Sequence, residues 1–316
     1  MSISTPVAFF IFNRPDLTKI VFDAIAQAKP KQLLVVADGP RVSAEAEKCQ
    51  ITRSVIDQID WECEVLINYS EKNMGCKHRV SSGLDWVFAQ VEEAIILEDD
   101  CLPAPSFFDF CETLLDRYRH DERIMMISGD NFQNGQPTND YSYYFSKYTH
   151  IWGWASWRRA WQYYDVNMTT WPEYKKSNAI CSVCEDPCEQ KFWIDTFDRV
   201  FDGAVDTWDY QWLYASWCQS GLSILPNSNL ISNIGFGIDG THTYNDSPWA
   251  RLPIADIWEI KHPPFMVRNK LADTYTFMNH YGGINLKKND SLMFKLKNKY
   301  QSLKQRLQAI FKRIYQ

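Results

Sequence analysis

The sequence predicts an α/β protein in which helices flank a mostly parallel β-sheet. Over about the first 100 residues, short apolar runs typical of buried strands alternate with stretches in which apolar residues recur at helical spacing. Strands that alternate with helices pair in parallel, because each helix carries the chain back to the same end of the sheet. The two patterns together indicate a doubly wound sheet.

The elements follow one another in a regular order. Residues 6–12 are a compact apolar run, and apolar residues from Leu17 to Ala28 then recur every three or four positions, which predicts a strand followed by a helix. A second strand precedes Asp38, where Gly39 and Pro40 break the chain. The later elements are expected at 41–59 (helix), 63–69 (strand), 82–90 (helix), 93–100 (strand) and 123–131 (strand).

The composition changes after Asp140, where Trp and Tyr become frequent without an intervening Pro, Gly or Ser linker. We therefore predict an α/β half at 1–140, a second lobe packed on it at 141–285, and a basic amphipathic C-terminal helix at 286–316. In that last segment Leu, Ile and Tyr recur every three or four residues between Lys and Arg. Such a helix can lie on an anionic membrane surface, pair in a homodimer, or remain solvated.

The charges are unevenly distributed. Residues 287–316 contain nine Lys or Arg and one acid, so this segment carries a charge of +8 and the preceding residues carry −14. An acidic body argues against nucleic acid as the main partner. No apolar window approaches the length of a membrane span and no signal peptide is recognisable, so we expect a cytoplasmic protein, either free or peripheral on the inner face of the membrane.

Nine cysteines with scattered spacing indicate reduced thiols rather than a disulfide framework. Cys181, Cys184 and Cys188 are close in the sequence, but a zinc site normally needs a fourth Cys or His. A loop of unpaired thiols is favoured, and metal binding there stays open.

Polar residues stand where several strands end: Asn13 and Arg14, Asp38, residues 73–79, and the consecutive acids at 98–100. In parallel sheets ligands bind beyond the carboxyl ends of the strands, so these residues are expected to converge on one crevice. Neither a G-x-G-x-x-G segment after the first strand nor a P-loop is present.

The acids Glu98, Asp99 and Asp100 suggest a cation site. Carboxylates this close repel one another, and a bound cation relieves the repulsion. Oxygen ligands suit Mg²⁺ or Mn²⁺, which typically take one or two carboxylates and complete their shell with water and phosphate. The alternative is an acidic, solvated strand end.

Four segments carry a family resemblance: "VVADGPR", "NMGCKHRVSSGLDWVF", "LEDDCLPAPSFF" and "DTWDYQW". Over roughly residues 5–245 the chain resembles nucleotide-sugar glycosyltransferases of the GT-A fold, in particular the N-acetylglucosaminyltransferase I group and bacterial family-2-like enzymes. The resemblance implies an inverting enzyme that needs Mn²⁺ or Mg²⁺. It would move a sugar from a UDP-sugar, UDP-GlcNAc among the candidates, to a hydroxyl of a glycan or lipid-linked acceptor in bacterial surface polysaccharide synthesis.

The resemblance also assigns roles to residues. Those expected to hold the nucleotide sugar are Asn13, Arg14, Asp38, Arg79, Glu98 and Asp99. Asp100 would ligate the metal, and His242, in the glycine-rich run 231–246, would ligate it or touch the diphosphate. Each assignment has a structural alternative: the arginines can pair with surface acids, Asp38 can belong to an ordinary turn, and a lone His242 can be structural.

A catalytic base is needed to remove the acceptor hydroxyl's proton. Asp209, within Trp208-Asp209-Tyr210, matches the segment that bears the base in the resembled group. Because Tyr210 replaces an acid there, Asp206 and Asp195 are kept as alternatives.

The tryptophans of residues 150–161 have two interpretations. Trp154, Trp157 and Trp161 follow helical spacing, which predicts a mainly buried helix. Trp152 and Trp154 are the expected acceptor contacts, since the resembled family places acceptor contacts in this region. Two other function classes remain: a carbohydrate-binding module, favoured by the tryptophans, and a metal-dependent phosphohydrolase, which needs further ligands at strand ends.

Overall fold

The computed structural model of the protein describes residues 2–236, 248–288, 293, 299 and 300. These residues form an eight-stranded sheet, a two-stranded sheet and flanking helices. The strands of the large sheet are β1 (Val7–Ile11), β2 (Gln32–Ala37), β3 (Glu64–Tyr69), β4 (Glu93–Glu98), β6 (Ile124–Ser128), β7 (Tyr143–Ser146), β8 (Trp154–Trp157) and β9 (Leu222–Pro226). The small sheet contains β5 (Cys101–Pro103) and β10 (Ile231–Asn233).

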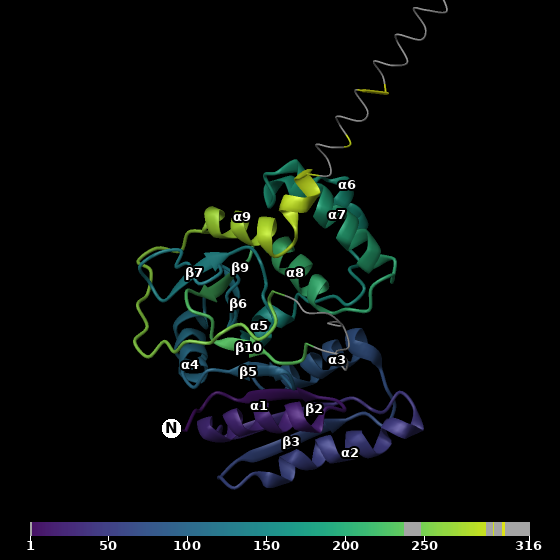
Figure 1. Cartoon of the computed structure of the whole chain (residues 1–316), viewed down its shortest axis with the longest axis vertical. Helices are drawn as coiled ribbons and strands as arrows, with labels where there is room; N and C mark the ends of the chain where they lie inside the picture. Colours follow the sequence, from purple (N-terminus) through teal and green to yellow (C-terminus); the bar gives the residue numbers. More distant parts are fainter. Residues whose placement is uncertain (1, 237–247, 289–292, 294–298, 301–316) are drawn as a thin grey trace, which may run out of the picture.

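Most helices are short and lie on both sides of the large sheet. The α-helices are α1 (Pro15–Ala28), α2 (Ala46–Ser54), α3 (Gly75–Gln90), α4 (Phe107–Tyr118), α5 (Arg158–Trp161), α6 (Trp171–Lys176), α7 (Pro187–Phe201), α8 (Asp209–Cys218) and α9 (Lys270–Asn279). Short 3₁₀ helices are η1 (Ser43–Glu45), η2 (Val55–Gln58) and η3 (Ala179–Ser182). Figure 1 shows α1 and α2 at one end of the molecule and α6, α7 and α9 at the other.

The large sheet has the strand order β3-β2-β1-β4-β8-β6-β9-β7. The first four strands are parallel, with Val7 of β1 opposite both Leu33 of β2 and Ile95 of β4. Strand β8 is antiparallel to its neighbours β4 and β6, and β7 is antiparallel to β9. The predicted class, an α/β protein with a mostly parallel sheet flanked by helices, is confirmed.

Both faces of the parallel strands are buried. Along β1, Val7 and Phe9 pack in the cluster that includes α1 and α4, whereas Ala8 and Phe10 pack in the cluster that includes α3 and α8. Successive side chains of a strand point to opposite faces, so a strand covered on both sides needs apolar residues throughout. This explains the uninterrupted apolar runs.

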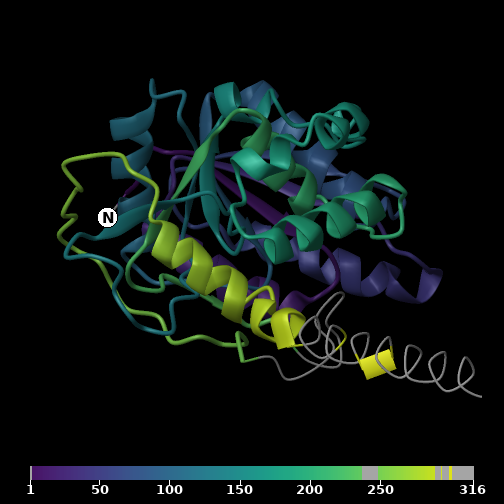
Figure 2. The same ribbon diagram turned by 90° about the horizontal axis from the view of Figure 1, so that it is seen from above.

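A third cluster, rich in aromatic residues, joins α6, α7, α8 and α9. Trp193 lies at its centre, with ring centroids 5.5 Å from Phe197, 5.3 Å from Trp217 and 4.9 Å from Tyr281. Figure 2 shows α9 running beside the helices of this cluster. Strands β7, β8 and β9, which follow residue 140, extend the same large sheet. The division of the chain at residues 140 and 285 stays a prediction.

The helical interpretation of Trp154, Trp157 and Trp161 is wrong for the first two. Both belong to β8, which is hydrogen-bonded between β4 and β6, and only then does the short helix α5 begin. The three-residue spacing places Trp154 and Trp157 on opposite faces of the sheet, in different clusters. A strand buried on both faces lacks the polar alternation that would have distinguished it from a helix.

Helix α3 begins at Gly75 and not near residue 82. Its first turn is held by acids that are distant in sequence: Asp38 accepts from the backbone N–H of Met74 at 2.9 Å, and Asp206 from that of Lys77 at 3.1 Å. The early N–H groups of a helix lack partners within the helix, so these acids supply them. The helix predicted at 41–59 is divided into η1, α2 and η2.

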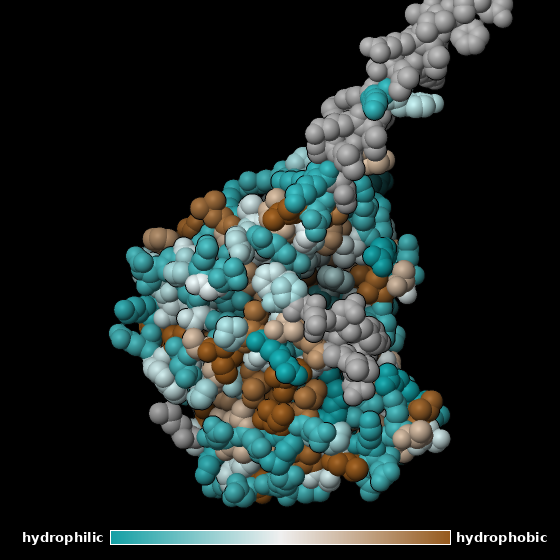
Figure 3. Space-filling view, in the orientation of Figure 1, coloured by the Kyte–Doolittle hydropathy of each residue, from teal (hydrophilic) through white to brown (hydrophobic). Residues whose placement is uncertain are grey.

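Most of the predicted C-terminal helix 286–316 lies outside the described residues. Within the described part of the chain, no helix combines the length and the apolar composition that crossing a bilayer requires. The face in Figure 3 is largely hydrophilic, with apolar side chains gathered where β5 and α1 meet. A groove there is lined by Ile3, Ala24 and Phe108, beside Trp258, which is 64% exposed.

Gly153, directly before β8, packs closely against Ile231 of β10. Its φ is +60°, and a Cβ built on it would lie 2.4 Å from Cδ1 of Ile231. We expect Gly153→Ala to lower the free energy of unfolding by about 3 kcal/mol, through overpacking and an unfavourable left-handed backbone. Gly203 has φ +73° with nothing within 4 Å of such a Cβ, so Gly203→Ala should cost only about 1 kcal/mol. Chemical denaturation measures both, and equal losses would contradict the packing argument.

Candidate functional site

A cleft of about 530 Å³ lies at the carboxyl ends of β1, β2 and β4 and extends to the start of α8. Of the residues predicted from the sequence, the cleft is lined by Arg14, Asp38, Arg79, Glu98, Asp99, Asp100, Trp152 and Asp209. Parallel strands bring their carboxyl ends to one edge of the sheet, and this explains why residues so distant in sequence meet here.

Arg14 and the consecutive acids form the centre of the cleft. Strands β1 and β4 are neighbours, with Phe10 opposite Glu98, so the loop after β1 lies against the acids that end β4. The Nη2 of Arg14 donates to Oδ1 of Asp99 and, at 3.0 Å, to Oδ2 of Asp100. The backbone N–H of Phe12 donates to the other oxygen of Asp99 at 3.2 Å. For Arg14 and the acids at 98–100, the predicted convergence on one crevice is confirmed.

Burial and mutual repulsion change the protonation of two of these acids. Desolvation raises the pKa of Glu98, and the charges of Asp100 and Asp99 raise it further. Desolvation also raises the pKa of Asp99, although the charge of Arg14 opposes this shift. The described residues that line the cleft include six acids and three arginines. Negative charge is therefore in excess even when Glu98 is protonated, and this excess would favour a cation.

Asp38 and Arg79 line the cleft, but their side chains are hydrogen-bonded to other parts of the protein. Asp38 accepts from the N–H groups of Gly39 at 2.8 Å and Met74 at 2.9 Å, and from Nδ2 of Asn73 at 2.9 Å. Only 7% of Asp38 and 6% of Arg79 is exposed. These contacts connect the loop after β2 to the start of α3.

Arg79 connects the ends of two strands. Its Nε donates to the carbonyl oxygen of Ala37 in β2 at 3.2 Å, and its Nη2 donates to Oδ1 of Asn68 in β3 at 3.0 Å. Burial lowers the pKa of Arg79, against the charge of Asp38, which raises it. Both residues therefore shape the cleft, and contact with a nucleotide stays a prediction.

Asn13 does not line the cleft; its Nδ2 donates to Oε1 of Glu45 at 3.2 Å. Trp154 is 1% exposed and packs against Trp161, Trp208 and Trp212, so it does not present a face to an acceptor. That expectation is wrong, because β8 places this residue inside the core between two neighbouring strands. His242, which the sequence predicts as a metal ligand, lies outside the described residues.

Asp209 begins α8 and lines the same cleft as the acids of β4. Its charge is the smallest of the contributions to the shifted pKa of Glu98, after burial and the charges of Asp100, Asp99 and Arg14. Oδ1 of Asp209 accepts from the hydroxyl of Thr207. Asp206 also lines the cleft, where it holds the first turn of α3.

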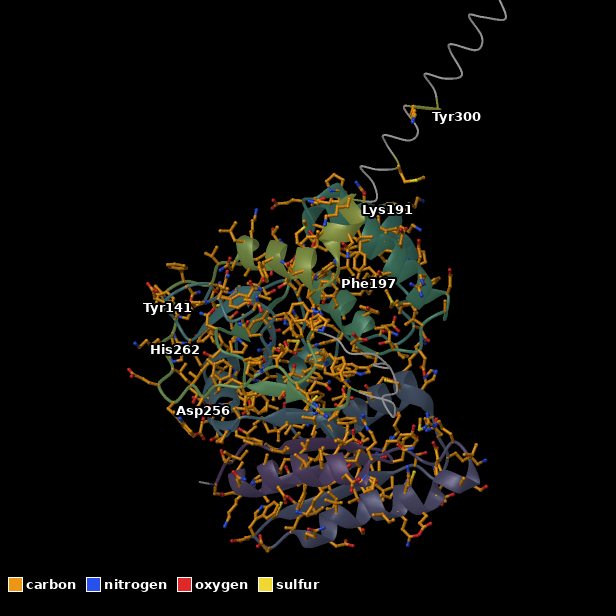
Figure 4. The ribbon with its side chains drawn as sticks, in the orientation of Figure 1. Tyr141, Lys191, Phe197, Asp256, His262 and Tyr300 are labelled. Atoms are coloured by element: carbon orange, nitrogen blue, oxygen red, sulfur yellow. The ribbon has the colours of Figure 1, made fainter. Side chains whose placement is uncertain are left out.

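Asp195, the other alternative for the base, lies on the outer side of α7. It pairs with Lys191, and its side chain is 57% exposed. Figure 4 labels Lys191 at the end of the molecule opposite to β2 and β3. Asp195 is not among the residues that line the cleft.

Trp152 occupies the edge of the cleft. Its ring contacts Phe132 and Phe236 edge to face, with centroids 5.1 Å and 5.7 Å away, and its backbone N–H donates to Oδ2 of the buried Asp130 at 3.1 Å. Trp152 is only partly buried. A partly exposed indole at the edge of a polar cleft can contact the apolar face of a sugar ring.

Sequence reasoning missed Gly235, which lies against Asp100. A Cβ built on Gly235 would be 2.2 Å from Oδ2 of Asp100. The signal was the glycine-rich run at 231–246, and the pairing of β10 with β5 brings the first residues of this run to the acids. Arg41 was also missed; its guanidinium lies over the ring of Phe12 at 5.2 Å.

The acids at the tip of β4 would fit a divalent cation whose remaining ligands come from a substrate and water. Among the described residues, no group of three or more His, Cys, Asp or Glu forms a site that could hold a metal alone, and this includes Cys181, Cys184 and Cys188. One or two carboxylates from the tip of β4, with phosphate oxygens and water, match the usual coordination of Mg²⁺ or Mn²⁺. A glycine at 235 also avoids a collision with the carboxylate of Asp100.

No family model matches the sequence, and neither does any curated protein. Among solved structures, residues 1–349 of S. aureus TarS match 72% of this chain over 59% of their own length, with 8% identity and a TM-score of 0.42. A longer TarS structure matches 44% of the chain over 25% of its own, with 12% identity and a TM-score of 0.32. A UDP-glucose pyrophosphorylase complexed with UDP-glucose matches 47% over 64%, with 11% identity and a TM-score of 0.26. At these values the matches assign no function.

The raised pKa of Glu98 predicts how stability changes with pH. A carboxyl whose folded pKa is above its usual value binds more protons in the folded state, so stability falls as pH rises from the usual pKa of 4.5 towards the folded one. We expect the free energy of unfolding of the wild type to decline over this window by up to about 1.4 kcal/mol per pH unit.

The matched variant is Glu98→Gln, which keeps the shape of the side chain without a titrating proton. Chemical denaturation at several pH values should give a shallower decline for this variant. An identical slope in both proteins would show that Glu98 does not titrate in this way.

Proposed function

We propose that the protein is a metal-dependent glycosyltransferase. It would move a sugar from a nucleotide sugar, of the UDP class, to a hydroxyl of a glycan or lipid-linked acceptor, with Mn²⁺ or Mg²⁺ as cofactor. The observation that carries the proposal is that Arg14, the three acids at the tip of β4 and Asp209 all line one cleft. The family resemblance of the same segments supports it.

The donor half of the proposal rests on charge. Glu98, Asp99 and Asp100 would repel the diphosphate of a nucleotide sugar, so donor binding requires positive charge from Arg14 and from a divalent ion beside Asp100. When bound, this ion would supply electrostatic stabilisation of the charge that develops on the leaving diphosphate. Asp38 and Arg79 keep the ends of β2 and β3 and the start of α3 in place around the nucleotide.

The acceptor half rests on Asp209. The acceptor hydroxyl attacks the anomeric carbon while a carboxylate takes its proton, and the bond from that carbon to the diphosphate breaks. Asp209 lines the same cleft as the acids beside which the leaving diphosphate would bind. A single displacement of this kind inverts the anomeric centre. Trp152, at the edge of the cleft, would contact the acceptor.

A binding experiment tests the proposal directly. The midpoint of thermal unfolding should rise when UDP and Mn²⁺ are added together, and ligand at 100 times its Kd adds about 2.7 kcal/mol to the free energy of unfolding. Labelled UDP-sugars should release UDP only when Mn²⁺ or Mg²⁺ is present. Binding of free sugars without any response to UDP would instead indicate a carbohydrate-binding module.

Variants of Asp100 and Asp209 should distinguish the binding of UDP from the transfer of the sugar. We expect Asp100→Asn to weaken Mn²⁺-dependent UDP binding at least about tenfold, because a carboxylate is a much better ligand for Mn²⁺ than an amide. Asp209→Asn should bind UDP as the wild type does and lose about 10²- to 10⁴-fold in turnover. Calorimetry and a UDP-release assay measure the two effects, and full turnover by Asp209→Asn would exclude this residue as the base.

A substitution at Gly235 should affect the binding of Mn²⁺ and UDP through the side chain of Asp100. In Gly235→Ala the new methyl group would collide with the carboxylate of Asp100, so we expect Mn²⁺-dependent UDP affinity to fall by about the same factor as in Asp100→Asn. Gly135→Ala is the control, since a Cβ there meets nothing within 4 Å. Unchanged UDP affinity in Gly235→Ala would mean that Asp100 can move aside without loss.

A further inference from the structure

Arg14 holds Asp99 and Asp100 through one nitrogen. Its Nη2 donates to Oδ1 of Asp99 and to Oδ2 of Asp100, and no other side chain bridges these two acids among the described residues. Because both bonds come from the same atom, the bond to Asp100 can be lost without displacing the bond to Asp99.

The two contacts of Arg14 differ in strength. The side chain of Asp99 is 3% exposed and also accepts from the N–H of Phe12, so this partner is fixed inside the protein. Asp100 is 16% exposed, and its contact with Arg14 is longer. Within the described residues, the recorded donor to its other oxygen is a weak one, the thiol of Cys101 at 3.5 Å. Ion pairs weaken with exposure to water, so the contact of Arg14 with Asp100 should break more easily than its contact with Asp99.

A metal ion and Arg14 would compete for Asp100. A divalent cation at either oxygen of Asp100 would stand within a few ångströms of the guanidinium, and the two positive charges would repel. A diphosphate removes the conflict, because a guanidinium binds phosphate oxygens at least as well as a carboxylate. Arg14 lines the same cleft and is partly exposed, so it can reach a ligand there.

We propose that Arg14 couples metal binding to nucleotide binding by exchanging its partner. Without nucleotide, its contact with Asp100 keeps the affinity for a divalent cation low. When a nucleoside diphosphate enters, the guanidinium leaves Asp100 for a phosphate oxygen and frees the carboxylate for the ion. The inference rests on the proposed function and adds to it that metal and nucleotide bind cooperatively, each raising the affinity for the other by the same factor.

The experiment measures Mn²⁺ binding by electron paramagnetic resonance, with and without UDP, in the full-length protein. In the wild type we expect UDP to raise the affinity for Mn²⁺ at least about tenfold. In Arg14→Gln we expect Mn²⁺ alone to bind at least about fivefold more tightly than in the wild type, and UDP to add less than about twofold. Equal affinity of Mn²⁺ alone for both proteins would overturn the proposal.

The control is Arg41→Gln, which removes the same charge from the same cleft. Among the described residues, Arg41 pairs with Glu45 and lies over Phe12, whereas the ion pair with Asp100 is made by Arg14. A similar gain in Mn²⁺ affinity in this variant would attribute the effect to net charge and would also overturn the proposal. Arg14→Lys, which keeps the charge, gives a second comparison if Arg14→Gln does not fold, and we expect it to retain weak binding of Mn²⁺ alone.

The outcomes separate this inference from the proposed function. If UDP with Mn²⁺ does not bind to the wild type, the glycosyltransferase proposal fails, and the comparison of Mn²⁺ alone still decides whether Arg14 competes for Asp100. If UDP binds to the wild type but Arg14→Gln keeps the full UDP enhancement, the function stands and the coupling through Arg14 is wrong.

Discussion

The accumulation of negative charge at the tip of β4 is the constraint on which the site depends. Arg14, at the end of the neighbouring strand β1, partly offsets the repulsion among three consecutive acids there, because it pairs with two of them. The pairing of Phe10 with Glu98 sets this position, so the register of the parallel sheet determines the ion pair. Acids still outnumber arginines along the cleft, and the metal that we propose would supply the missing positive charge.

Much of the remaining polar chemistry in the cleft supports its shape. Asp38 accepts from the start of α3, Arg79 connects the ends of β2 and β3, and Asp206 holds the first turn of α3. These bonds form between segments distant in sequence, so they fix loops that would otherwise be free to move. A cleft fixed in this way does not have to reorganise when charge develops in it, which is the usual source of electrostatic catalysis.

The aromatic residues serve mainly as core. Trp154, Trp161 and Trp212 pack together under the cleft, and the cluster around Trp193 supports α7 and α8. Because Asp209 is the first residue of α8, this packing positions the proposed base. Trp152 differs from the others in being partly exposed at the cleft edge, which is why an abundance of tryptophan is by itself weak evidence for sugar binding.

The sequence by itself determined the α/β class, the alternation of the first strands and helices along the chain, and the convergence of Arg14 with Glu98 to Asp100. Apolar runs and the residues that end them are local properties, and parallel pairing then brings strand ends together. The tertiary structure alone decided that β8 is a strand, that Asp38 and Arg79 hold the cleft wall, and that Gly235 touches Asp100. These features depend on contacts between distant segments, which no local pattern records.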